Sequence, residues 1–377
     1  MPLSDLTFGA SEREAVLRVL ESRWISTGPE VAAFESEFAA SCDVAHAVAV
    51  SSATAALHLS LIAIGTTAGD EIVQPALNFV ATANMTRAVN AAPVFADIAS
   101  LDEPVITAET VKPLLTERTR AIVVMHYGGA PAVTAELLDL CHDRGIVLLE
   151  DAAHAVGAVY GPAAPPILQR RAVGGAGVMA CFSFFSNKNL ATGEGGMITT
   201  NDDDLAARVR LLRSHGMTTM SWDRFSGHAR SYDVPVVGFN YRMDDLRAAL
   251  GRTQLAALMQ NNTARRALRS AYVEALGDLK GWTVPNADPE RAGAAHLMVV
   301  VAPDADTRNR AVEKLTAAGV QTSLHYPSVT SFRAYADRAA QVPCTLEFAS
   351  RAITLPLWPG LPRAAVTSIA AVLAACA

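Results

Sequence analysis

The sequence predicts an α/β fold, with a large domain built on a mostly parallel, helix-covered sheet and a smaller α/β domain after it. Three observations support this prediction. Apolar strands alternate with amphipathic helices up to about residue 150. The strands are apolar on both faces, as in parallel sheets covered by helices on both sides. The 377 residues also exceed the usual size of one hydrophobic core. We expect the large domain over residues 1–245 and the small domain over 246–377.

The N-terminal half supplies the alternating elements. Apolar residues at helical spacing predict helices over residues 11–26 and 29–42, followed by a strand over 46–51. A helix over 51–65 starts at a serine cap and ends at Gly65. The next elements are expected at strand 70–75, helix 78–91, strand 93–97, strand 119–127, helix 133–145 and strand 146–151. This order favours parallel strands joined by helices.

The pattern changes after residue 202. A helix over 202–216 precedes a polar and aromatic loop over 217–238, and a long helix begins near Met243. Strands over 296–303 and 320–326 are then expected on either side of a helix over 305–319. These elements are sufficient for a smaller α/β domain.

Composition restricts the kind of partner. The formal charge is −6 and no run of Lys or Arg occurs, which argues against nucleic acid and against a charged membrane surface. The longest apolar runs, such as AIVVM and GIVLL, are far shorter than the roughly 20 residues that span a bilayer. The N-terminus carries acids where a signal peptide needs cations, so we expect a cytoplasmic protein with small-molecule partners. Five cysteines without CxxC or Cys/His spacing predict neither disulfides nor a metal site.

The stretch FSFFSNKNLATGEGG, residues 182–196, contains an unusual lysine. Only four of the 31 basic residues are lysines, so the sequence nearly always uses arginine as its surface cation. Lys188 lies between aromatic residues and a glycine-rich turn, a poor setting for a solvated ammonium. A lysine amine can form a Schiff base with an aldehyde cofactor and can then carry a proton between two carbon atoms.

Two carboxylates end the predicted strand IVLLED. Ligands of parallel sheets bind at the carboxyl ends of the strands, where Glu150 and Asp151 lie. A carboxylate against the ring nitrogen of pyridoxal 5′-phosphate (PLP) keeps that nitrogen protonated, so the ring can accept electrons. Strand alternation sends the two side chains to opposite faces, and we choose Asp151 for this role. A capping or salt-bridged carboxylate is the alternative.

A phosphate site is predicted where VSSATAALHL enters a helix. Backbone amides and the helix dipole make such a start an anion site, with Ser52, Ala53 and Thr54 as candidates. Ser183 could add a hydroxyl to the same phosphate, and Phe79 could stack on the cofactor ring. The alternatives are that the serine and threonine only cap the helix and that the phenylalanine is a core residue.

The order and spacing of these motifs resemble the DegT/DnrJ/EryC1/StrS sugar aminotransferases, a family of fold type I, aspartate-aminotransferase-like PLP enzymes. The similarity runs nearly the whole length of the chain. It is carried by the blocks RWISTGPEVAAFESEFA, SSATAALHLSLIAIGTTAGDEIVQPALNFVATAN, VVMHYGGAPA, LEDAAHAVGAVY, ACFSFFSNKNLATGEGGMITT, GFNYRMDDLRAALG, GVQTSLHYPS and ITLPLWPGL. The resemblance implies a seven-stranded type of sheet. The chain departs from the family where SSAT replaces a GT-type turn and where SNK lacks the usual proline or threonine.

The resemblance also implies roles for individual residues. Lys188 would be the Schiff-base lysine, Asp151 the partner of the pyridine nitrogen, and Phe79 the stacking ring. Ser183 and the amides at Ala53 and Thr54 would hold the phosphate.

Two further roles follow from the resemblance alone. His154 stands where the family has Gln or His near the ring oxygen of the cofactor, and a hydrogen-bonded core histidine is the alternative. Asn240, in FNYRM, would reach the phosphate in the neighbouring subunit, which implies a homodimer with shared active sites.

The predicted activity is a ping-pong amino transfer in which the cofactor alternates between PLP and pyridoxamine 5′-phosphate. The resemblance implies L-glutamate as donor and the keto group of a nucleotide-linked deoxysugar as acceptor, in amino sugar or antibiotic biosynthesis. The retained lysine favours transamination over the dehydratase chemistry of relatives that carry histidine there. The alternatives are a ketone without a nucleotide, such as a keto-cyclitol, and a regulatory protein that binds PLP without turnover.

Substrate contacts are the least determined part of the site. Four residues of the loop over 217–238 could meet a diphosphate and a base, or could be ordinary surface residues: Arg224, Arg230, Trp222 and Tyr232. Four residues near strand ends could touch sugar hydroxyls, or could be packing residues: His126, Tyr127, His325 and Tyr326.

Overall fold

The structure is a computed structural model that describes residues 1–162, 164–219, 222, 227, 231–277, 279–288, 293–337 and 340–376. The α-helices described are α1 (Ala10–Ser22), α2 (Pro29–Cys42), α3 (Ala53–Ala63), α4 (Ala81–Ala88), α5 (Ala108–Val111), α6 (Ala135–Arg144), α7 (Asp203–Leu212), α9 (Asp245–Leu276), α10 (Ala305–Ala317), α11 (Pro343–Arg351) and α12 (Arg363–Ala374). The strands are β1 (His46–Val50), β2 (Glu71–Pro75), β3 (Ala92–Ala96), β4 (Thr119–Met125), β5 (Val147–Asp151), β6 (Met179–Ser183), β7 (Gly196–Thr200), β8 (Met298–Val301) and β9 (Ala352–Leu355). None of the helices described is both long and apolar enough to cross a bilayer.

A seven-stranded sheet forms the centre of the large part of the molecule. The strand order is β1-β7-β6-β5-β4-β2-β3, and only β7 runs antiparallel to its neighbours. A parallel neighbour would need a crossover connection, usually a helix. Residues 184–195 between β6 and β7 form no helix, and the chain reverses its direction there, so β7 is antiparallel. The predicted mostly parallel α/β fold is therefore confirmed, with β7 as its antiparallel exception.

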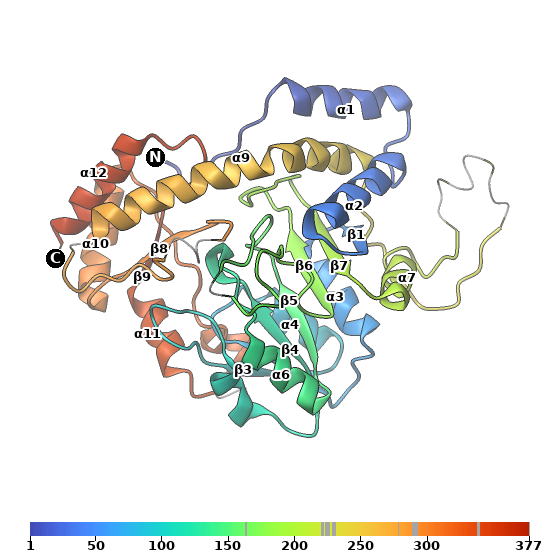
Figure 1. The fold of residues 1–377 in the computed structure, drawn as a ribbon, viewed down its shortest axis with the longest axis horizontal. Helices are drawn as coiled ribbons and strands as arrows, with labels where there is room; N and C mark the ends of the chain where they lie inside the picture. Colours follow the sequence, from blue (N-terminus) through green and yellow to red (C-terminus); the bar gives the residue numbers. More distant parts are fainter. Residues whose placement is uncertain are drawn as a thin grey trace.

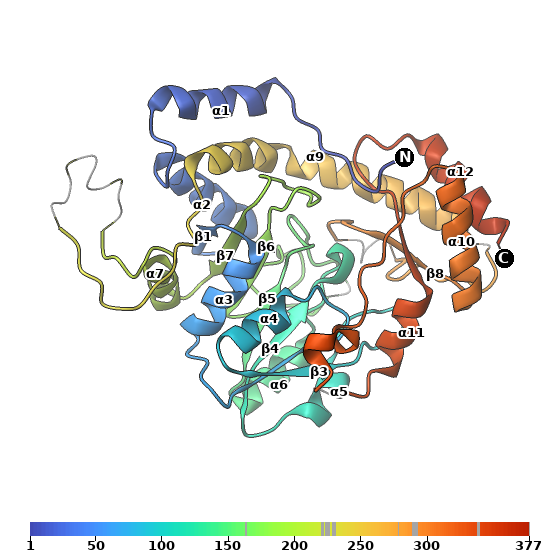
Figure 2. The ribbon, with the colours of Figure 1, turned by 180° about the vertical axis from the view of Figure 1, so that it is seen from behind.

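Alternating residues of each strand feed two cores on opposite faces of this sheet. In β1, Ala47 and Ala49 join the core under α2 and α6, whereas Val48 and Val50 join the core under α3 and α7. Figure 1 shows α6 in front of the sheet, and Figure 2 shows α3 and α4 in front of it from behind. Strands buried on both faces have no polar side, which explains the continuous apolar runs in the sequence.

A separate core lies in the C-terminal part of the chain. It joins the antiparallel pair β8–β9 with α10, α12 and the last turns of α9. The strand expected over residues 320–326 is wrong, because only Ser323 bridges to Thr354 there. The four residues of β9 are all buried and pair with β8 along its length instead. The domain boundary that we predict at residues 245–246 lies in the first turn of α9, and it stays a prediction.

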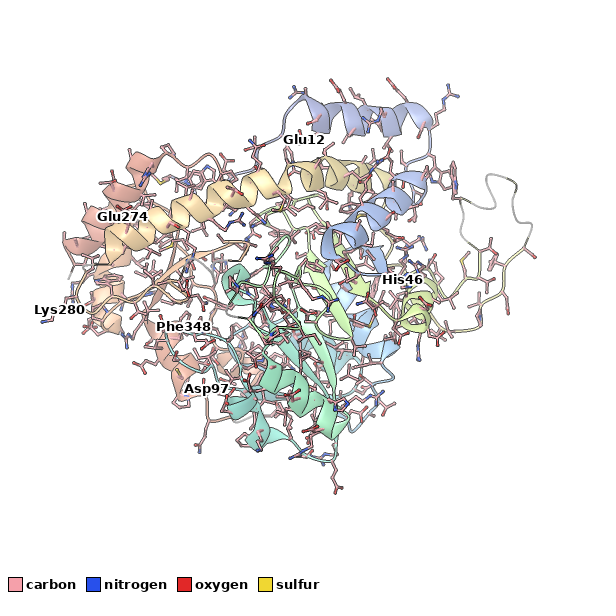
Figure 3. All side chains as sticks on the ribbon, in the orientation of Figure 1. Glu12, His46, Asp97, Glu274, Lys280 and Phe348 are labelled. Carbon is pink, nitrogen blue, oxygen red and sulfur yellow. The ribbon has the colours of Figure 1, made fainter. Side chains whose placement is uncertain are left out.

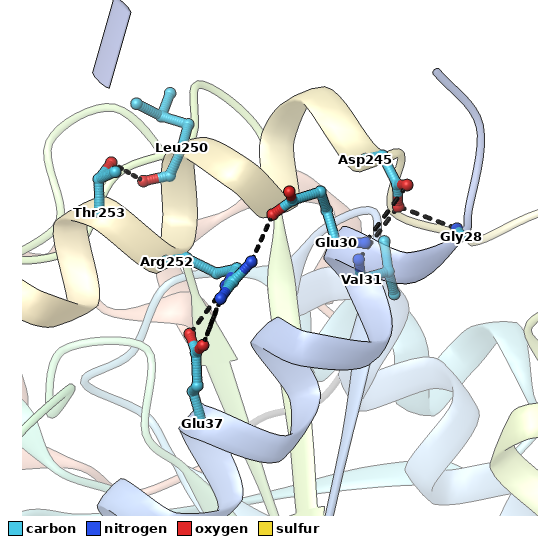
Figure 4. Close-up of polar contacts among 8 residues, drawn as sticks. All are labelled: Gly28, Glu30, Val31, Glu37, Asp245, Leu250, Arg252 and Thr253. Carbon is cyan, nitrogen blue, oxygen red and sulfur yellow. Dashed lines mark hydrogen bonds and ion pairs between the residues drawn. The ribbon is translucent and has the colours of Figure 1, made fainter. Parts of the chain in front are cut away.

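Helix α9 fixes the N-terminal block on the sheet (Figure 4). The buried Asp245 carboxylate accepts hydrogen bonds from the backbone N–H groups of Gly28, at 2.9 Å, and Val31, at 3.0 Å, so it caps α2 from a distant part of the chain. Arg252, two turns further along, binds both Glu30 and Glu37 at 2.7 Å. A helix cap and a shared guanidinium together hold α2 in place.

Helix α11 returns the chain to the large sheet. Asp97, just after β3, accepts hydrogen bonds from the N–H groups of Cys344 and Thr345 at the start of α11. Phe348 of the same helix packs edge-on against the ring of Tyr127, with centroids 5.8 Å apart. Figure 3 labels Asp97 and Phe348 in this region. The segment 325–337, which lies before this helix in the chain, passes the carboxyl end of β2, where the Val329 N–H donates to the Ala76 carbonyl.

Candidate active site

A cavity of about 410 Å³ opens at the carboxyl ends of the parallel strands. Ten residues singled out from the sequence line it: Ser52, Ala53, Thr54, Phe79, Asp151, His154, Ser183, Lys188, His325 and Tyr326. They come from the ends of four strands of the large sheet, β1, β2, β5 and β6, or from the segments that follow them, and from one segment of the C-terminal part. Parallel topology explains this convergence, because all these strands end at the same edge.

Asp151 forms the floor of the cavity. Its Oδ2 accepts hydrogen bonds from Thr82 Oγ1 at 3.1 Å and from Asn78 Nδ2 at 3.3 Å, and its Oδ1 accepts one from the Ala153 N–H at 3.2 Å. The carboxylate is only 4% exposed. Three donors orient it, so it can present an oxygen to a positively charged N–H group in the cavity.

Glu150 points away from the cavity, as strand alternation requires. It binds His126 Nε2 at 2.9 Å, and both side chains are fully buried. Its other oxygen accepts the N–H groups of Ala176 and Gly177, while His126 Nδ1 accepts the N–H of Ala132. All polar atoms of this pair are therefore occupied by protein partners.

Lys188 is half-buried in the turn between β6 and β7. Burial lowers the pKa of its amine to about 8, although Asp151 opposes this shift. Within the described residues its Nζ makes no hydrogen bond or ion pair. The next residue, Asn189, donates to Asn262 Oδ1 at 2.8 Å and to the Ala294 carbonyl at 2.7 Å, so it fixes the turn to the rest of the chain. A fixed, partly neutral amine is suited to nucleophilic and base chemistry.

The start of α3 has the features of an anion site. Ser52 Oγ accepts the N–H of Ala55 at 3.1 Å, and no acidic residue lies in the first turn. The N–H groups of Ala53 and Thr54 precede the first intrahelical bond, which Ala56 donates to the Ser52 carbonyl, and both residues line the cavity. A Cβ on Gly196 would lie 2.5 to 2.7 Å from backbone atoms of Ser52 and Ala53, so this close approach of α3 to β7 requires glycine.

Two further residues complete the wall near this anion site. Ser183 Oγ accepts the N–H of Phe185 at 3.3 Å, which leaves its O–H hydrogen available to a ligand. The ring of Phe79 is 55% exposed and lies 5.8 Å from the ring of Tyr326. The alternative of a buried core phenylalanine does not hold for Phe79.

His154 and the segment around His325 close the far side. His154 Nδ1 accepts the N–H of Gly128 at 3.3 Å, and its Nε2 contacts Tyr326 Oη at 2.8 Å. Burial lowers the pKa of His154 well below its usual range, and Lys188 and His325 lower it further. Burial also lowers the pKa of His325, to about 4, again with a contribution from Lys188. Both imidazoles are therefore neutral near pH 7.

The other candidate residues lie elsewhere. His126 is buried and paired with Glu150, outside the cavity. The buried hydroxyl of Tyr127 donates to the His325 carbonyl, so both side chains are occupied by protein partners. Asn240 is exposed and lies outside the cavity of its own chain. Trp222 packs edge-on against Trp24, and Tyr232 is 54% exposed; Arg224 and Arg230 lie outside the described residues.

Sequence reasoning missed several residues of the site. Asn78 and Thr82 hold Asp151, Asn189 fixes the lysine turn, and Glu194 lines the mouth of the cavity. Asn78 immediately precedes Phe79, and Glu194 belongs to the glycine-rich turn after Lys188. Their position next to predicted site residues was the only feature of the sequence that could have indicated them.

The residues fit PLP. The cavity combines an anion site for a phosphate, an amine for an aldehyde, and a buried carboxylate for a ring nitrogen. The fold and the cavity therefore define an α/β enzyme of the PLP-dependent class.

Comparisons identify the group within that class. Residues 7–374 match the DegT/DnrJ/EryC1/StrS aminotransferase family, and the chain belongs to it. The spore coat polysaccharide biosynthesis protein SpsC of Bacillus subtilis is 37% identical over 96% of this chain and 93% of its own length. PseC of Helicobacter pylori, an aminotransferase in pseudoaminic acid biosynthesis, superposes with a TM-score of 0.90 at 27% identity over 100% of this chain and 98% of that one. DesI, solved in the presence of its TDP-sugar product, gives 0.86 at 31% identity over 99% and 91%.

These findings establish the general activity. The protein is a PLP-dependent aminotransferase that acts on sugars, as the family resemblance of the sequence predicted.

Proposed function

We propose that the protein transfers an amino group from L-glutamate to the keto group of a nucleotide-linked deoxysugar by a ping-pong mechanism. One observation carries this proposal: a half-buried lysine with a pKa of about 8, a buried and oriented carboxylate, and a helix start share one cavity. This set supplies a base, a ring partner and a phosphate site without any metal.

The residues of the chain divide the work. PLP, when bound, supplies the aldehyde that takes up the amino group and the ring that withdraws electrons. Lys188 holds the aldehyde end and, once displaced, moves the proton of the donor α-carbon, because near pH 8 half of its amines are neutral. Asp151 keeps the ring nitrogen protonated, and the start of α3 with Ser183 holds the phosphate.

A homodimer with shared sites forms part of the proposal. Asn240 is exposed and outside its own cavity, which leaves it available to a second subunit. By the family resemblance it would reach the partner's phosphate.

The similarity to DesI, which was solved with a TDP-sugar product, supports a nucleotide-linked acceptor. Polysaccharide or antibiotic biosynthesis would use such a product. The competing acceptor is a ketone without a nucleotide, such as a keto-cyclitol.

The first test is an absorption spectrum of the protein with PLP, before and after excess L-glutamate. We expect a visible band of the lysine-bound cofactor that L-glutamate converts to the shorter-wavelength band of the amine form. Lys188→Ala should lack this behaviour, whereas Lys280→Ala, which removes an exposed lysine, should retain it. A lysine-dependent band that no amino donor changes would instead favour a binding protein without turnover.

The acceptor is tested next with the amine form of the enzyme. Keto-sugar nucleotides and the matching free keto-sugars are offered in parallel, and aminated products are measured by mass spectrometry. Faster return of the PLP band with the nucleotide-linked sugars is expected. Equal rates with the free sugars would contradict a nucleotide-linked acceptor and leave the amino transfer intact.

A further inference from the structure

Two consecutive hydrogen bonds in the wall of the cavity join Gly128, His154 and Tyr326. The donor and the acceptor of each bond can be assigned. The Gly128 N–H donates to His154 Nδ1 at 3.3 Å, and a backbone N–H can only donate. The hydrogen of the neutral imidazole must then sit on Nε2. His154 Nε2 therefore donates to Tyr326 Oη, 2.8 Å away.

The surroundings of His154 keep this direction fixed. The side chain is 2% exposed, and its ring lies 4.5 Å from the ring of His296 and 5.8 Å from that of Tyr326. Burial and the neighbouring Lys188 and His325 hold the pKa of His154 well below its usual range. A second proton on the imidazole would also have to displace the Gly128 N–H.

The hydroxyl hydrogen of Tyr326 has no acceptor among the described residues. Its oxygen is occupied by the hydrogen from His154, so its own hydrogen is available to a ligand. Burial raises the pKa of Tyr326, with a contribution from Asp151, so the hydroxyl stays protonated. Tyr326 lines the same cavity as Lys188 and Phe79.

We propose that Tyr326 donates a hydrogen bond to an oxygen of the molecule that fills this cavity, and that His154 is a positioning residue for it. The oxygen acts as an acceptor towards Tyr326, as the ring oxygen of the cofactor or a carbonyl or carboxylate oxygen of a substrate can. The proposal rests on the proposed function. It also changes the expectation for His154, whose two nitrogens are both occupied by protein partners and leave no hydrogen for the cofactor.

Substitutions can separate the two roles. Tyr326→Phe keeps the ring beside Phe79 and removes only the donor. His154→Gln keeps both bonds, because the amide oxygen can accept from Gly128 and the amide nitrogen can donate to Tyr326. His154→Phe keeps the volume and removes both bonds. Tyr272→Phe is the matched control, since this buried hydroxyl binds the Pro356 carbonyl at 3.0 Å, in the separate C-terminal core.

The experiment titrates the absorption of each PLP-bound protein with pH in the absence of substrate, and then measures kcat and KM for each substrate. Loss of the donor should shift the spectral midpoint by about one pH unit if the acceptor is the cofactor oxygen. If the acceptor belongs to a substrate, loss of the Tyr326 donor should instead raise KM or lower kcat for that substrate by about tenfold. His154→Phe should reproduce Tyr326→Phe, and His154→Gln should restore the wild-type values.

The double variant is decisive for the positioning role. If His154 acts through Tyr326, His154→Phe should add nothing in a Tyr326→Phe background. Wild-type titration and kinetics in Tyr326→Phe would overturn the proposal, and additive effects would overturn the positioning role. A wild-type protein without a Lys188-dependent band would instead mean that the proposed function itself fails.

Discussion

The surroundings of the Lys188 amine favour its neutral form. Burial lowers its pKa from 10.5 to about 8, with Asp151 opposing. In the unfolded chain the amine is protonated up to about pH 10.4, so between these values the unfolded state binds more protons than the folded state. This residue therefore costs stability in full below pH 8, and the cost disappears as the pH rises towards 10.5.

Replacement of Lys188 by Met tests this cost in the cofactor-free protein. We expect Lys188→Met to have a higher free energy of unfolding than wild type at pH 7, and the difference to shrink between pH 8 and 10.5. Urea denaturation at several pH values measures it. A difference that does not depend on pH would mean that the lysine pKa is unchanged by folding.

Asp151→Asn removes a charge and keeps the shape. Since the phosphate site and Lys188 remain, PLP should still bind, but the ring nitrogen loses its anionic partner. We expect the glutamate half-reaction to slow by at least about 100-fold, which is about 2.7 kcal/mol in the barrier. Stopped-flow absorption measures this rate. An unchanged rate would remove the assigned role of Asp151.

Some residues of the site could be predicted from the sequence because their residue type is uncommon in this chain or because of their position at the end of a strand. Lys188 stood out in a chain that prefers arginine, and Asp151 followed from strand alternation. His126 and Tyr127 were ambiguous, because the backbone beyond a strand end does not fix where a side chain points. Asn78 and Asn189 were marked only by their position beside Phe79 and Lys188, since a hydrogen bond to a distant residue leaves no local pattern.

At the scale of the element, the start of α3 allows ligand binding to be separated from helix stability. An acid in the first turn stabilises a helix by about 0.3 to 1 kcal/mol, yet it would repel a phosphate. We expect Ala53→Asp to keep the thermal stability of the cofactor-free protein and to weaken PLP binding by at least about tenfold.

A matched change on another helix is the control. Ala135 is the first residue of α6, whose N-cap is Thr134 and which lies away from the cavity. PLP affinity of both variants is measured by fluorescence titration, and Ala135→Asp should leave it unchanged. Equal losses in both variants would point to a general effect of the added charge.

Elements were predictable where the local pattern and the tertiary pairing agreed. The helix expected over residues 29–42 coincides with α2, and the five strands expected before residue 152 lie within one or two residues of their expected positions, whereas β6 and β7 were not expected as strands. The strand expected over residues 320–326 was misplaced because tertiary pairing, and not local sequence, makes β9 the partner of β8. The direction of β7 depends on a turn whose path local propensity does not specify.

At the scale of the whole molecule, the proposed sharing of active sites in a homodimer predicts complementation between two defective subunits. Lys188→Ala lacks the amine, and Asn240→Asp would place a negative charge beside the partner's phosphate. In a mixed dimer, one site combines both defects and the other has neither. Co-expression should therefore restore about a quarter of the wild-type sites at limiting PLP, as random pairing of a two-fold dimer requires. No activity above that of the separate variants would exclude an exchange of Asn240 between subunits.

The overall architecture was the most predictable level. Alternating elements with strands apolar on both faces allow few arrangements other than a helix-covered parallel sheet. The course of α9 could not be predicted, because its contacts with α2 depend on Asp245 and Arg252 meeting residues more than 200 positions away.

The pairing of β1 also determines when the site can assemble during synthesis. β1 is paired from His46 to Val50 with a strand that ends at Thr200, and Val50 also bridges to Arg242. The proposed anion site at the start of α3 directly follows β1, so its position depends on the pairing of β1. We therefore expect that a nascent chain cannot retain the cofactor until β7 and Arg242 have left the ribosome. At about 5 to 20 residues per second, the N-terminal block waits about 10 to 40 s for them. During this interval the apolar strand β1 is unpaired, and unpaired apolar strands are prone to aggregation.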